Sequence, residues 1–169
     1  MILLTLVNLE GLSSGSNMET VLCALAEVVS LRFVNGVGPR PGIMGIDYSA
    51  AFWLYTELGY RAYRIDSVDD VTKPFVSMYF GAAYLVWLSE YEGRERTPQF
   101  VVQAYIAGPK NVNLQETGPL RLKFEQAFGN YEDTKRKGAA PSCKLPNFTL
   151  HISQDLLGSV PQVASDYID

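Results

Sequence analysis

The sequence predicts an all-α fold, a compact bundle of five to six short helices with a groove. Apolar residues recur at helical spacing in several segments, and capping residues, prolines and glycines mark where these segments begin and end. The length of 169 residues suits one domain, and a hydrophobic fraction of 47% with 19% charged residues supports a buried core. These values exclude the disordered and membrane-spanning classes.

The first half of the chain predicts two helices separated by a Gly/Pro-rich loop. Ser16 and Glu19 form a capping box for a helix that runs to about Phe33. Residues 35–42 are expected to break regular structure. Ser49 then caps a second helix over residues 50–58, with a glycine after it in the C-cap position.

The second half predicts three more helices, each opened by a proline. Pro74 suits the first turn of a helix that stops at Gly93. Thr97 and Pro98 open a fourth helix over residues 99–107. A fifth runs from the Thr–Gly–Pro triplet at 117–119 to about Phe128, before Gly129.

The composition changes at both ends of this helical region. We expect residues 1–15 to be a short N-terminal segment, 16–133 the domain and 134–169 a largely irregular tail whose apolar stretches, such as 148–152, are able to dock. Residues 1–9 are apolar but lack a basic region and are too short to span a membrane. An intracellular location is therefore expected, and a secreted one is the alternative if the N-terminus is incomplete.

Charge and cysteine content limit the expected partners. The net charge of −4 argues against nucleic acid or an anionic membrane as a partner. Cys23 and Cys143 show no metal-ligand spacing and no disulfide framework, which favours a reducing compartment. His151 has no neighbours typical of a catalytic triad or a metal site, and no metal or other cofactor is expected. The oligomeric state stays open.

One acid stands alone in the first apolar helix. Glu27 is flanked by Ala26 and Val28, and an apolar setting favours the protonated form that a general acid needs. The alternative is an ordinary surface or ion-paired residue, which is the commoner place for Glu in a helix. Further along the chain come Gly42-Ile43-Met44-Gly45 and Ala104-Tyr105-Ile106-Ala107-Gly108-Pro109.

These pieces together resemble one family. Glu27, Gly42-Ile43-Met44 fifteen residues later, Phe80-Gly81-Ala82-Ala83-Tyr84-Leu85 and the segment 104–109 follow the order seen in soluble lytic transglycosylase domains of the lysozyme-like superfamily. The chain looks most similar to the lysozyme-like proteins of land plants, over about residues 17–130. The resemblance implies a glycosidase-type domain acting on peptidoglycan or chitin, polymers that contain β-1,4-linked N-acetylglucosamine.

The resemblance also implies roles for individual residues. Glu27 would be the single acid and base, with assistance from the acetamido group of the substrate, and Tyr105 its orienting hydroxyl. The sugar groove would include the following residues: Gly42, Ile43, Met44, Gly45, Ile106 and Ala107. A conventional two-carboxylate glycosidase needs a second acid, for which Asp47 is the nearest candidate.

Three positions depart from the family pattern, each toward a less polar residue. Val28 replaces a serine, Gly45 a glutamine and Ile106 an asparagine. Each lost hydrogen bond would weaken sugar binding by about 1 kcal/mol. The second hypothesis is therefore a catalytically degenerate module that binds glycan or another protein.

Simpler structural roles also exist for the remaining candidates. Tyr105 is interpretable as a packed core tyrosine, and Trp53 and Trp87 suit core packing. Gly42 and Gly45 are as readily explained by turns as by close approach to a ligand.

Overall fold

The structure is a computed structural model that describes residues 18–31, 36–37, 40–112 and 118–138. Within these ranges it contains five α-helices, three short 3-10 helices and one two-stranded pairing. The prediction of an all-α class is therefore confirmed. The predicted N-terminal segment 1–15 and most of the predicted tail lie outside the described residues.

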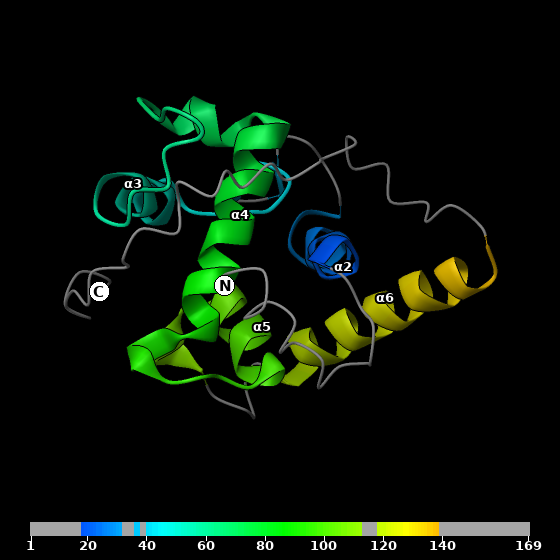
Figure 1. The fold of residues 1–169 in the computed structure, drawn as a ribbon. Coiled ribbons are helices and arrows are strands. Elements are labelled where there is room, and N and C mark those ends of the chain that lie inside the picture. Colours follow the sequence, from blue (N-terminus) through cyan, green and yellow to red (C-terminus); the bar gives the residue numbers. More distant parts are fainter. Residues whose placement is uncertain (1–17, 32–35, 38–39, 113–117, 139–169) are drawn as a thin grey trace.

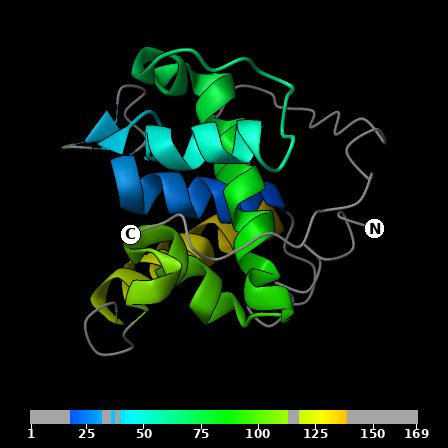
Figure 2. The ribbon, with the colours of Figure 1, turned by 90° about the vertical axis from the view of Figure 1, so that its left-hand side faces the viewer.

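Helix α4 (Pro74–Ser89) is the centre of the fold. It is apolar all round, and its residues 76–85 are buried without interruption, because other elements cover every side. In Figures 1 and 2, α4 passes between α3 (Tyr48–Thr56) and the pair formed by α2 (Met18–Ser30) and α6 (Gly118–Arg136). Helix α5 (Pro98–Ala107) packs against both α4 and α6.

Helix boundaries follow the local signals with small shifts. Pro74 and Pro98 begin α4 and α5 as predicted, and the Thr97 hydroxyl accepts the backbone N–H of Phe100 as an N-cap. Helix α3 begins at Tyr48, two residues before the predicted start at Ala50, and Asp47 instead of Ser49 occupies the N-cap position. Helix α2 ends at Ser30, before Leu31 turns to a φ of 51°.

Helix α6 is longer than predicted. Gly129 was expected to lie beyond its end, but the helix continues to Arg136, past the predicted domain boundary at Thr134. Phe124, Phe128 and Tyr131 form a buried stripe that continues across Gly129. Tertiary packing of this stripe therefore outweighs the weak stop signal of one glycine.

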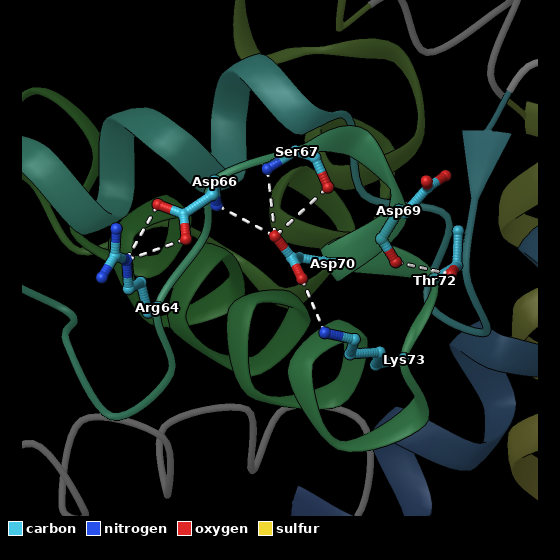
Figure 3. Close-up of polar contacts among 7 residues, drawn as sticks. All are labelled: Arg64, Asp66, Ser67, Asp69, Asp70, Thr72 and Lys73. Carbon is cyan, nitrogen blue, oxygen red and sulfur yellow. Dashed lines mark hydrogen bonds and ion pairs between the residues drawn. The ribbon is translucent and has the colours of Figure 1, made fainter.

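Short elements fill the loops between the helices. The predicted irregular loop contains a pairing of β1 (Gly36–Val37) with β2 (Arg40–Pro41) in antiparallel register. Three 3-10 helices follow: η2 (Val68–Thr72), η3 (Tyr91–Gly93) and η4 (Pro109–Asn111). At the start of η2 the Asp70 carboxylate accepts the backbone N–H groups of Asp66 and Ser67 and pairs with Lys73, as Figure 3 shows.

One expectation about the cysteines is wrong. Cys23 is buried, with 1% of its surface exposed, and takes part in a disulfide bond. The second cysteine of the sequence, Cys143, lies outside the described residues. Since disulfides persist mainly in oxidising compartments, the argument for a reducing compartment loses its support. No helix among the described residues has the length and apolar character needed to cross a bilayer.

Candidate functional site

The tetrapeptide Gly42–Gly45 is held from three sides by buried hydroxyl groups. Ser30 at the end of α2 donates to the Ile43 carbonyl at 2.6 Å, and Ser77 of α4 accepts the Met44 backbone N–H at 3.1 Å. Tyr105 of α5 donates to the Met44 carbonyl at 2.9 Å. The tetrapeptide is therefore a point where three helices are joined.

This role leaves most of the tetrapeptide inaccessible to a ligand. Ile43 and Met44 are 4% and 0% exposed. Gly42 has a φ of +73°, and a β-carbon there would lie 2.3 Å from the Val71 carbonyl oxygen. The glycine at position 42 is thus required by the backbone conformation, and Gly45 is the residue of the tetrapeptide that lines the pocket described next.

That pocket, which we call the α3–α5 pocket, has a volume of about 320 Å³. It lies between the start of α3, the middle of α4 and the end of α5. Its lining consists of Arg40, Gly45, Ile46, Asp47, Ser49, Ala50, Trp53, Tyr84, Tyr105, Ala107, Gly108, Pro109, Lys110 and Asn111. Aromatic and polar groups of both charge signs therefore face the same space.

Charged and polar groups stand at the rim of the α3–α5 pocket. Asp47 occupies the N-cap position of α3, yet its exposed carboxylate makes no capping hydrogen bond. The Arg40 guanidinium donates to the Ile106 carbonyl and so joins β2 to the end of α5. Asn111 donates to the Ala107 carbonyl at 3.1 Å, which fixes its amide at the opposite edge.

Aromatic side chains form the inner wall of the pocket. Trp53 packs edge-on against Trp87 with ring centroids 4.9 Å apart, and Tyr84 stacks on Trp87. Burial, together with the nearby Asp47 carboxylate, raises the pKa of Tyr84 to about 12. Burial raises the pKa of Tyr105 further above its ordinary value. Both phenols are therefore neutral hydrogen-bonding groups at physiological pH.

Glu27 lies in a different place, which we call the α2–α6 groove. This open groove of about 480 Å³ is lined by Glu27, Val28, Leu31, Lys123, Gln126, Ala127, Asn130, Tyr131 and Thr134. The half-buried Glu27 carboxylate accepts the Tyr131 hydroxyl at 3.1 Å. Its partner hydroxyl thus comes from α6, whereas the sequence analysis expected Tyr105.

The predicted site is consequently divided. Glu27 lines the α2–α6 groove, while Tyr105, Gly45 and Ala107 line the α3–α5 pocket. Ile106 contributes its backbone carbonyl to Arg40, and its side chain is 9% exposed. The structure therefore does not bring Glu27 and Tyr105 together, because the Tyr105 hydroxyl donates to Met44.

Sequence reasoning missed several residues of the α3–α5 pocket. Arg40, Ser49, Lys110 and Asn111 carry no motif that marks them as ligand contacts, and Tyr84, although it belongs to the quoted segment 80–85, was given no ligand role. Asp47 and Ser49 lie two positions apart at the start of α3, a spacing that gives no local signal of a shared site. The others meet only when α4 and α5 pack.

Comparisons of the chain with protein-family models, with curated proteins and with solved structures find no match. The resemblance to lytic transglycosylase domains therefore rests on the sequence motifs alone. Among the described residues, no group of three or more His, Cys, Asp or Glu side chains is arranged to hold a metal ion.

Proposed function

We propose that this chain is a lysozyme-like domain that binds a β-1,4-linked, N-acetylglucosamine-containing glycan in the α3–α5 pocket without cleaving it. The observation that carries this proposal is the direction in which the side chains of α2 point. Val29 faces the tetrapeptide, with its β-carbon 3.4 Å from a β-carbon placed on Gly45. Glu27 precedes it by two positions, about 200° around the helix, and faces α6.

The chemistry of the α3–α5 pocket favours a sugar ligand. Its volume falls at the lower end of the range for small-molecule sites, about 300 to 1,000 Å³. Trp53 offers an apolar ring for a pyranose face, and Asp47, Ser49 and Asn111 offer hydrogen-bonding groups for hydroxyl and acetamido substituents. Because Asp47 makes no capping bond, its carboxylate is available to accept two ligand hydroxyls.

Isothermal titration calorimetry with chitin oligosaccharides tests this proposal. Asp47→Ala should weaken binding about tenfold, since a hydrogen bond to a charged group contributes about 1.5 kcal/mol or more. Asp133→Asn on the exposed side of α6 removes a carboxylate that does not line the pocket and should leave the affinity unchanged. No heat of binding to the wild-type chain, with any oligosaccharide, would reject the glycan ligand.

The second candidate function is cleavage of the same glycan by Glu27. The half-buried carboxylate and the Tyr131 hydroxyl favour it, because such a pair can exchange a proton with a ligand in the α2–α6 groove. Mass spectrometry of chitin and peptidoglycan fragments, run beside Glu27→Gln, separates the two. Anhydro-ended products that vanish in the variant would establish lytic cleavage, whereas intact substrate in both samples supports binding alone.

A further inference from the structure

An exposed aromatic side chain on α3 has no role in the pocket described above. Phe52 is 41% exposed, and it belongs to the large apolar side chains that packing leaves in contact with water. Its ring stacks on that of Tyr48, one helical turn earlier, with ring centroids 5.7 Å apart and planes inclined by 27°. The two rings order each other and form an aromatic surface, which we call the α3 platform.

We propose that the α3 platform is a second sugar subsite, on which the glycan lies where it leaves the α3–α5 pocket. This inference rests on the proposed function and deepens it, because the ligand is then an oligosaccharide longer than the pocket holds. Phe52 is the residue that makes affinity depend on the length of the glycan.

The platform lies beside the pocket on the same helix. Ser49, which lines the pocket, precedes Phe52 by three residues, so the two side chains are about 60° apart around the helix axis. Along the axis they are about 4.5 Å apart, which is close to the length of one pyranose unit in a β-1,4-linked chain. A sugar that contacts Ser49 therefore places the next unit at the level of Phe52.

The α3–α5 pocket accommodates only a short part of such a chain. Its volume of about 320 Å³ leaves room for about one or two sugar units. Exposed residues of the lining lie at the start of α3, as Asp47 and Ser49, and in η4, as Lys110 and Asn111. An aromatic ring follows the first of these two exits, whereas η4 has no aromatic residue. The exit along α3 is therefore the one suited to a sugar.

The chemistry of the platform suits a pyranose ring. The face of an exposed aromatic ring packs against the C–H groups on one side of a sugar. Thr56, one turn after Phe52, donates its hydroxyl to the Phe52 carbonyl at 2.9 Å, and its oxygen can still accept a sugar hydroxyl. Because Tyr48 already orders the Phe52 ring, contact with the ligand costs little side-chain entropy.

The size of the platform favours a sugar over a second copy of this chain. An aromatic side chain has about 150 to 250 Å² of surface to bury. Two partly exposed rings therefore offer much less than the roughly 1,000 Å² that a stable protein interface buries. One pyranose face, in contrast, is about as large as one aromatic ring.

Isothermal titration calorimetry with chitin oligosaccharides of two and four sugar units tests the subsite. The tetrasaccharide should bind the wild-type chain about fivefold more tightly than the disaccharide, because it adds an aromatic contact. Phe52→Ala should remove this difference and leave the affinity for the disaccharide unchanged. Phe52→Tyr should keep the difference, because it keeps the aromatic face.

Leu122→Ala is the matched control for Phe52→Ala. Leu122 is an exposed apolar side chain of α6 that lines neither the α3–α5 pocket nor the α2–α6 groove, so the difference between the two oligosaccharides should persist. Tryptophan fluorescence shows that the pocket of Phe52→Ala is folded, because Trp53 lines it and should respond to the disaccharide as in the wild-type chain.

The outcomes separate this inference from the proposed function. Equal affinities of the wild-type chain for both oligosaccharides, or a difference that persists in Phe52→Ala, would overturn the subsite while binding that depends on Asp47 stands. Absence of binding by either oligosaccharide would reject both. Unchanged affinities in Phe52→Ala, together with a loss of self-association in analytical ultracentrifugation, would assign the platform to a second copy and overturn the subsite.

Discussion

The β-carbon of Val29 lies 3.4 Å from the point that a β-carbon on Gly45 would occupy. Beside Gly45, α2 therefore presents the apolar Val29, while the next residue, Ser30, donates to the Ile43 carbonyl. A carboxylate at position 29 would lie beside Gly45, whereas the carboxylate of Glu27 faces α6 and accepts the Tyr131 hydroxyl. Proton transfer at the α3–α5 pocket therefore lacks the group that the sequence motifs assigned to it.

Gly81 in α4 permits the close approach of the tetrapeptide. A β-carbon there would lie 2.9 Å from the Met44 β-carbon and 3.0 Å from the Tyr105 hydroxyl oxygen. Gly81→Ala should therefore lower the free energy of unfolding by about 1 to 3 kcal/mol, through overpacking and loss of the Tyr105 bond. Urea unfolding followed by circular dichroism measures this change.

Gly129→Ala in α6 is the matched control for this substitution. No atom lies within 4 Å of a β-carbon at Gly129, and the position is exposed within a helix. Alanine should raise the free energy of unfolding by about 0.5 to 1 kcal/mol, because glycine loses more backbone entropy on folding. Equal destabilisation by both substitutions would contradict the packing explanation for Gly81.

Removal of the Tyr105 hydroxyl distinguishes a structural role of this group from a catalytic one. Tyr105→Phe leaves the buried Met44 carbonyl without its donor and should cost about 1 to 3 kcal/mol of stability in thermal or urea unfolding. Any glycan cleavage that depends on Glu27 should keep its rate, because the two residues line different cavities. A fall in cleavage without a fall in stability would restore the catalytic role for Tyr105.

Gln103 in α5 is a buried polar group that costs stability. It is 1% exposed, and neither atom of its amide has a hydrogen-bond partner among the described residues. Gln103→Met has nearly the same shape without the polar atoms and should raise the free energy of unfolding by about 1 kcal/mol or more. A lower stability in urea would instead reveal a bridging water that the amide binds.

The Asp70 network at η2 makes stability depend on pH. The hydrogen bond from Lys73 makes the largest contribution to lowering the pKa of Asp70, and the hydrogen bonds from the backbone N–H groups of Asp66 and Ser67 add to it. Together they hold this pKa well below its usual range. Because the folded pKa is lowered, this stabilisation is complete above the unfolded value near 4 and is lost as the pH falls. Asp70→Asn should lower the melting temperature at pH 7 and change it much less at pH 2.

Asp69→Asn is a suitable control for the Asp70 variant. Asp69 occupies the same 3-10 helix and is exposed, and it is its backbone carbonyl that accepts the Thr72 hydroxyl. Differential scanning calorimetry of both variants at several pH values isolates the Asp70 contribution. A loss of melting temperature in Asp70→Asn that stays constant with pH would rule out the ionised network as its cause.

Local signals were sufficient for most of the helical architecture. Pro74 and Pro98 fix φ and lack an N–H that the first turn would leave unpaired, so they mark helix starts without help from the rest of the chain. Gly129 misled the prediction of α6, because the buried Phe124, Phe128 and Tyr131 stripe is recognised only against α2.

The sequence by itself determined the all-α class and the starts of α4 and α5 at Pro74 and Pro98. Only the tertiary structure decided that Glu27 and Tyr105 lie in separate cavities. The physical reason is that a helix turns by about 100° per residue, so a shift of two positions reverses the direction of a side chain. Residue types and spacing along the chain do not specify this rotation, whereas the packing of α2 between α4 and α6 does.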